Sequence, residues 1–377
     1  MQPEIEEVIA ALDVFFVFAA VASLLLVVHG LTRRRDVLTA SGQHLVTFAS
    51  AWLAYVVVGR WVELVVTLDE IPDVVSMGSE SDSLRDFARS ASLIVLMSVV
   101  TMAVMAERAT ILTHSLLAFL VGLAIWPLSQ RAVIHGELWD RLELPARSFH
   151  DPTGLLMVGA GGVGLGLAGV MILGPRLGRF GSNRQPRVIP GASLSVAVVG
   201  ALFFTLAISM HAALNASTLS DAETPLLAPL IVGLTGASAG SATAGLLGRI
   251  VHGVVGSTSL IRGALAGVVA STTAFHDASG VLWALGIGGA AGATAVLLWW
   301  LMVRSKIDDP AGVLATFASA VVWAAAATSA NASDQLIGVG LVFAFAFVLG
   351  AVLFGLLRVS RSLRLDPARE IAGLIPE

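Results

Sequence analysis

Long apolar stretches recur along the chain, and only brief polar segments separate them. Each stretch holds roughly 17–25 residues, which is the length at which an α-helix crosses the hydrocarbon region of a bilayer. Turn-forming residues gather in the connections between the stretches. The pattern predicts eleven membrane-spanning helices, over residues 8–31, 44–68, 88–106, 109–133, 153–174, 189–213, 224–248, 253–275, 278–303, 311–330 and 333–357.

The composition agrees with a membrane protein. Of the 377 residues, 56% are hydrophobic and only 13% are charged, and the mean hydropathy is +0.87. A soluble protein carries about 25% charged residues, because its surface is covered with polar groups. The 38 glycines suit helices that pack closely through small side chains. We therefore predict an all-α polytopic membrane protein.

The residue types in the chain disfavour several other classes of protein. The chain has no cysteine, which excludes disulfides, thiolate catalysis and Cys-based metal sites. None of the eight histidines stands at the spacing of a helical metal motif, so no metal site is expected. A formal net charge of −4 without long basic runs makes nucleic acid an improbable partner. No nucleophile–base arrangement stands out, so we expect neither an enzyme nor a cofactor.

The basic residues predict an orientation. With the N-terminus placed outside, sixteen Lys and Arg residues fall inside and five fall outside, while Arg60 lies within the second stretch. Cytoplasmic loops carry such an excess of positive charge. The prediction is a multi-pass protein of the cell (plasma) membrane, with its N-terminus outside and its C-terminus cytosolic.

An Asp-Pro-x-Gly motif occurs twice, at residues 151–154 and 309–312. Asp151 and Asp309 can accept hydrogen bonds from the first turn of a helix, and Pro310, like its counterpart, is tolerated there. Five predicted spans separate the two motifs, so they face opposite sides, as in the inverted repeats of transporters. We predict one transmembrane domain over residues 1–357, with halves at about 8–174 and 189–330 and an extra helix at 333–357. A short cytosolic tail follows at 358–377.

Short motifs in order along the chain resemble those of the ammonium transporter family (Amt/Mep/Rh). They are Gly30–Leu38, Ala106-Glu107-Arg108, Ile125–Ser129, Ile189-Pro190, Gly263–Ala270, Lys306–Pro310 and the tail from Leu357 to Leu374. The resemblance implies an eleven-helix, homotrimeric channel-like fold with an inverted repeat and one pore in each protomer. It also implies ammonium, ammonia or a related small amine as the substrate.

The pore is where this chain departs from the family. The resemblance implies one pore histidine eight residues after Asp151 and another eight residues after Asp309, but these positions hold Gly159 and Phe317. A pair of imidazoles supplies a donor and an acceptor inside an apolar channel, and neither replacement does so. In the family the aspartate corresponding to Asp151 organises the helix start, and direct substrate contact remains an alternative.

Other pore positions also differ from the family. The residues of the outer recruitment site correspond to Leu93, Val133 and either Ser209 or Met210, and the second gating phenylalanine corresponds to Leu206. An aromatic face attracts a cation, whereas these side chains offer none. The sequence therefore predicts an atypical entrance as well as an atypical pore.

Two histidines leave alternatives open. His114 is interpreted as a buried histidine bonded to a neighbouring helix, or as a pore polar group that has moved. His211 ends the sixth predicted span, where a solvated interfacial histidine is the simpler interpretation and a place in the outer vestibule the alternative.

Two functions remain. The first is an ammonium/ammonia transporter or channel-like membrane protein with an atypical pore. The alternative is a non-conducting ammonium sensor or regulatory relative that signals through its C-terminal tail to a separate cytosolic regulator.

Overall fold

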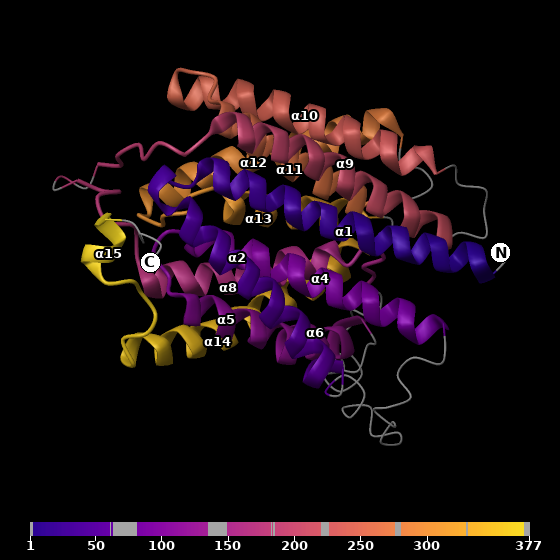
Figure 1. Cartoon of the computed structure of the whole chain (residues 1–377). Helices are drawn as coiled ribbons and strands as arrows, with labels where there is room; N and C mark the ends of the chain where they lie inside the picture. The colour runs from indigo at the N-terminus through magenta and orange to yellow at the C-terminus, as the bar shows by residue number, and fades with distance from the viewer. Residues whose placement is uncertain are drawn as a thin grey trace.

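The computed structural model is a bundle of helices whose long axes run side by side (Figure 1). It describes residues 3–60, 62, 81–134, 149–181, 183, 185–219, 226–275, 280–328 and 331–372. Within these ranges the only β-type pairings are two isolated bridges, Ala109 with Arg364 and Phe180 with Pro186. The fold is all-α, as the apolar pattern predicts.

Eleven helical segments in the described residues correspond one to one to the predicted spans. They are α1 (Pro3–Leu31), α2 (Val37–Ala54) continued by η2 (Tyr55–Gly59), α4 (Ser81–Met105), α5 (Ile111–Leu120) continued by η4 (Val121–Ile125), α6 (Trp126–Ser129) and η5 (Gln130–Ile134), α8 (Leu155–Leu173), α9 (Leu194–Leu219), α10 (Leu227–His252), α11 (Ser257–Thr273), α12 (Val281–Arg304), α13 (Val313–Ala327) and α14 (Ala332–Val359). The short helices η1 (Arg34–Asp36) and α15 (Pro367–Ala372) lie outside this set. Eight of the segments are each long and apolar enough to cross a membrane.

The start of the second span differs from the prediction. The apolar stretch predicts a helix from residue 44, but α2 begins at Val37. Because the first turns of α2 contain polar residues, the hydropathy pattern does not indicate a helix there. They are nevertheless buried: Gln43 is 2% exposed, and its side-chain amide donates to the carbonyl of Ala109 at 2.9 Å. The polar start of α2 therefore contacts the connection between α4 and α5.

α8 lies at the centre of the bundle, and its glycines allow the neighbouring helices to approach. A Cβ on Gly161 would lie 2.7 Å from Cε of Met97 on α4, and one on Gly164 would strike the backbone of Phe343 on α14. Sixteen of the 19 residues of α8 are buried. The glycine run at 159–164 is thus a packing surface between helices, and α8 is the element around which the site is built.

The two Asp-Pro-x-Gly motifs form the same turn at opposite ends of α8. Gly154 and Gly312 both adopt left-handed backbone, with φ of +74° and +76°. The Asp151 carboxylate accepts from the amide of Met157 at 2.8 Å, and that of Asp309 accepts from the amide of Leu314 at 2.8 Å. Each aspartate therefore holds the first turn of the helix that follows it.

The contacts of these turns show that α8 and α13 are antiparallel. The turn before α13 meets the end of α8, because Asp308 binds Arg176, which follows that helix. The turn before α8 lies at the other end, where Arg89 of α4 donates to the carbonyl of Pro152. This arrangement is the one expected of an inverted repeat.

Candidate functional site

The positions where the family resemblance places a pair of histidines lie together at the contact of α8, α9 and α13. Phe317 on α13 is fully buried, and its ring lies edge-on against Phe204 of α9, with centroids 6.3 Å apart and planes at 80°. Val321, one turn further along α13, is 3% exposed. These side chains form an apolar seal, a name we use for Phe204, Phe317 and Val321.

Gly159 completes the seal by having no side chain. A Cβ placed on it would collide with Cγ1 of Val321 and would lie 3.7 Å from Cδ1 of Phe317. The space that the missing imidazole leaves is therefore occupied by the valine. Phe204 and Val321 were not among the predicted site residues, because only the packing of three helices brings them to this point.

The predicted entrance residues contact different elements. Leu93 lies against Gly154, beside Trp126, whereas Val133 lines a cavity against α14. The hydroxyl of Ser209 donates to the carbonyl of Thr205 at 2.8 Å and lies close to Gly233 of α10. Among the described residues, these three side chains thus have different neighbours.

Leu206 lies on the outside of α9, with 44% of the residue exposed. Two residues earlier on the same helix, Phe204 is fully buried against Phe317. The α9 residue that meets the pore position of α13 is thus Phe204.

A buried polar cluster joins three elements near the start of α8. His211 is fully buried, and its Nδ1 lies 2.6 Å from Oδ1 of Asp13 on α1. Its Nε2 lies 2.8 Å from the carbonyl oxygen of Thr153, and the amide of Asn215 donates to Asp13 at 2.9 Å. The interpretation of His211 as a solvated residue is wrong.

His114 is also fully buried, as the simpler interpretation states. Its Nδ1, however, lies 2.8 Å from the carbonyl oxygen of Thr110, the residue that caps its own helix. The bond is therefore to its own helix start, not to a neighbouring helix.

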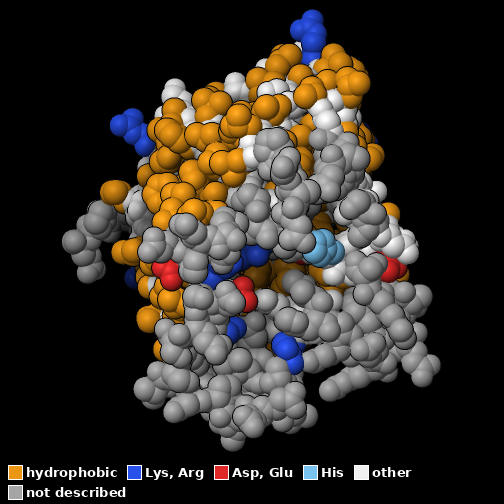
Figure 2. Space-filling model, turned by 90° about the vertical axis from the view of Figure 1, so that its right-hand side faces the viewer, with side chains coloured by type: hydrophobic (Ala, Val, Ile, Leu, Met, Phe, Trp, Pro, Cys, Tyr) orange, Lys and Arg blue, Asp and Glu red, His pale blue; other side chains and the backbone are white. Residues whose placement is uncertain are grey.

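Charged side chains gather at the end of the bundle where α1 begins (Figure 2). A small cavity of about 40 Å³ at this end is lined by Asp13, Arg85, Arg89 and Asn215, together with apolar side chains. Two guanidinium groups beside one carboxylate do not favour a cation. The described lining of this cavity therefore carries no excess of negative charge.

A network of ion pairs closes the opposite end of the bundle. The carboxylate of Asp308 lies 2.7 Å from Nε of Arg176, 3.3 Å from Nε of Arg179 and 3.7 Å from Nη1 of Arg108. Burial by itself raises the pKa of Asp308, but the hydrogen bonds and charge of Arg176 outweigh it and lower the pKa to about 2. Burial likewise lowers the pKa of Arg176, but its bonds to Asp308 and Glu107 outweigh burial and raise that pKa.

The C-terminal segment is docked on this network. Glu370 of α15 is 1% exposed and accepts from the amide of Leu177 at 2.7 Å and from Nε of Arg364 at 2.9 Å. Arg364 also donates to the carbonyl of Leu173, the last residue of α8, and to that of Pro175 just after it. The tail is thereby tied to the helix that carries Gly159.

Glu370→Ala is expected to release the tail, because it leaves the Leu177 amide and Arg364 without their carboxylate. Limited digestion with a nonspecific protease, followed by mass spectrometry, should show cleavage within 358–372 at least about five times faster than in the wild type, which corresponds to about 1 kcal/mol. Arg369→Ala, at an exposed neighbouring position, is the control. Equal rates for both variants would show that Glu370 does not hold the tail.

A profile of the Ammonium Transporter Family matches residues 8–375. The chain belongs to the ammonium transporter family. Members of this family are transporters and channels, so the chain is not an enzyme, and it is a multi-pass membrane protein. The resemblance of the short motifs is therefore confirmed over nearly the whole length.

Individual relatives agree with the family assignment. The chain is 30% identical to Ammonium transporter Amt2 of Haloferax mediterranei, over 76% of this chain and 66% of that protein. Its fold is similar to a solved structure titled "Sensor Amt Protein", with a TM-score of 0.86, 18% identity and coverage of 99% and 97% of the two chains. It is also similar to Rh50 of Nitrosomonas europaea, with a TM-score of 0.73, 17% identity and coverage of 96% and 90%. These structures show an Amt/Mep/Rh fold.

Proposed function

We propose that the protein transports ammonium or ammonia across the plasma membrane, along a path between the two inverted halves that passes the apolar seal. The observation that carries this proposal is the family match over residues 8–375 together with the meeting of Gly159 and Phe317 at the contact of the halves. Homotrimeric assembly, an outside N-terminus and a cytosolic C-terminus belong to the same proposal.

The seal favours neutral ammonia over the ammonium ion. Phe204, Phe317 and Val321 offer no hydrogen-bond donor or acceptor, and an ion pays a far larger desolvation cost than a neutral molecule in such surroundings. Passage requires Phe317 or Val321 to move, so we expect transport to be slow.

A non-conducting sensor is the second candidate, and the closed packing of the seal favours it. Phe317 and Phe204 are both fully buried, and Val321 fills the space beside Gly159. The structural relative with a TM-score of 0.86 is titled a sensor. The docking of Glu370 and Arg364 against the end of α8 supplies a connection from the path to the tail.

Phe317→Ala distinguishes the two functions. In proteoliposomes given an ammonium step, we expect slow internal alkalinisation without current for the wild type. The variant should be faster by about tenfold or more, which corresponds to a barrier lower by about 1.4 kcal/mol. Phe354→Ala, an equally buried phenylalanine beside Gly169, controls for the loss of packing and should leave the rate unchanged.

Absence of alkalinisation and current in correctly inserted wild type and Phe317→Ala would contradict transport. Ammonium binding measured by calorimetry on the same preparations would then support the sensor. An ammonium current in the wild type would instead overturn the preference for neutral ammonia.

A further inference from the structure

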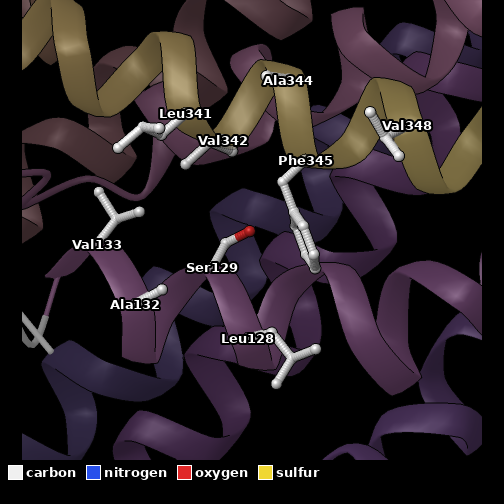
Figure 3. A pocket seen from close by; sticks show the side chains of 9 residues that line it. All are labelled: Leu128, Ser129, Ala132, Val133, Leu341, Val342, Ala344, Phe345 and Val348. Atoms are coloured by element: carbon white, nitrogen blue, oxygen red, sulfur yellow. The ribbon is translucent and has the colours of Figure 1, made fainter. Parts of the chain in front are cut away.

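An apolar cavity opens on the side of the bundle between the broken fourth segment and α14. Its volume is about 480 Å³, and its lining residues are Leu128, Ser129, Ala132, Val133, Leu341, Val342, Ala344, Phe345 and Val348 (Figure 3). None of these side chains is charged, and the cavity lies on membrane-spanning segments. It differs from the apolar seal and is not part of the proposed path.

Ser129 is the one polar side chain of the lining, and its hydroxyl points toward α14 (Figure 3). Ser129 is 2% exposed, and its hydroxyl has no hydrogen-bond partner among the described residues. In the other spanning helices, Ser23, Ser98 and Ser209 donate to the carbonyl four residues earlier. Ser129 makes no such bond, and it follows the π-helical η4 and Pro127. A buried hydroxyl without an acceptor is unfavourable, so the cavity is suited to an occupant that brings one.

We propose that this cavity binds one acyl chain of a diester membrane lipid, whose ester carbonyl accepts the hydrogen bond of Ser129. The cavity has the volume of a small-molecule pocket, and its lining fits hydrocarbon. Ala344 and Val348, at its rim, are exposed on the side of the bundle where lipid lies. The proposal goes beyond the transport function and does not depend on it.

The depth of Ser129 fits an ester. The apolar stretch that predicts the fourth span ends at residue 133, so Ser129 lies about 6 Å from the end of that stretch, at a rise of about 1.5 Å per residue. This position is close to the edge of the hydrocarbon region, where the ester groups of a lipid are found.

The occupied cavity would also brace the central helix. Val342 lines the cavity, and a Cβ on Gly161 of α8 would lie 3.8 Å from its Cγ1. Gly161 is two residues from Gly159. The bound chain therefore supports α14 against the part of α8 that carries the pore position.

Native mass spectrometry of the delipidated full chain, titrated with dioleoylphosphatidylcholine, tests the proposal. Val348→Trp should block the cavity and weaken the tightest lipid binding by about tenfold or more. Val352→Trp is a matched control, because the two valines are 58% and 57% exposed on the same helix and only Val348 lines the cavity. We expect the control to bind like the wild type.

Ser129→Ala tests the carbonyl contact. It should weaken binding of the diester lipid by about 3–10-fold and leave binding of the matching diether lipid unchanged, because the ether has no carbonyl. Since the hydroxyl has no partner in the lipid-free protein, the thermal midpoint without lipid should not fall.

Three results would overturn the proposal. The first is equal lipid binding by Val348→Trp and Val352→Trp. The second is an equal effect of Ser129→Ala on diester and diether lipids. The third is loss of oligomer, without loss of lipid, in Val348→Trp, which would make this face an interface between copies.

Discussion

Asp308→Asn is expected to lower the free energy of unfolding by about 3–5 kcal/mol, the usual cost of breaking a buried ion pair from one side. Asp308 is 3% exposed and is shared by Arg176, Arg179 and Arg108. The variant leaves three guanidinium groups around a neutral amide, whose own N–H groups cannot accept from them. The loop after α8, the end of α4 and the turn before α13 therefore lose their common anchor.

The thermal midpoint in detergent, followed by circular dichroism, measures this effect, and a fall of at least about 5 °C is expected. Asp366→Asn is the control, because Asp366 is exposed and caps α15 through the amide of Ala368, which asparagine can also do. Midpoints that agree for the two variants would show that the network does not stabilise the fold.

The pH dependence of stability should also show the contribution of the Asp308 carboxylate. The pKa of Asp308 is lowered to about 2 in the folded protein from its ordinary value of 3.8, because the hydrogen bonds and charge of Arg176 outweigh the effect of burial. A depressed pKa stabilises the fold above the unfolded value, and this contribution is lost as the pH falls through the folded one. Between about pH 4 and pH 2 the wild type should therefore lose stability more steeply than Asp308→Asn, as measured by thermal midpoints across that range.

Hydropathy and local turn chemistry predict most of the architecture. Each apolar stretch is long enough to require a helix, and the Asp-Pro-x-Gly turns at 151–154 and 309–312 have the helix starts that their residues favour. The start of α2 is not predicted, because Gln43 is satisfied by the carbonyl of Ala109 in the connection between α4 and α5. A hydropathy scale scores such a residue as solvent-exposed, because the scale contains no information on partners that are distant in the sequence.

The site was harder to predict because it depends on helix phase. Successive helical residues are about 100° apart, so a shift of two residues moves a side chain to roughly the opposite face. This is the difference between Leu206, which is 44% exposed, and Phe204, which meets Phe317. The partners of Asp308 could not be predicted either. Arg176 lies 132 residues away in the sequence, and its charge is typical of a basic loop.

Gly159→Ala is expected to destabilise the protein by about 1–3 kcal/mol, although alanine is normally the better helix former. The added methyl group would collide with Cγ1 of Val321. Gly286→Ala is the matched control, since Gly286 lies on an exposed face of α12 with nothing within 4 Å of an added Cβ. That control should be neutral or stabilising by up to about 1 kcal/mol.

A double-mutant cycle with Val321→Ala tests whether Gly159 and Val321 are in contact. Val321→Ala alone should cost about 2 kcal/mol through the cavity it leaves, but together with Gly159→Ala it supplies the space that the new methyl group needs. The double variant should therefore be more stable than the sum of the single effects by at least about 1 kcal/mol, measured by denaturant unfolding in detergent. Additive effects would mean that Gly159 and Val321 do not touch. The proposed path would then not be closed by Val321 beside Gly159, and the preference for neutral ammonia would rest on Phe204 and Phe317 alone.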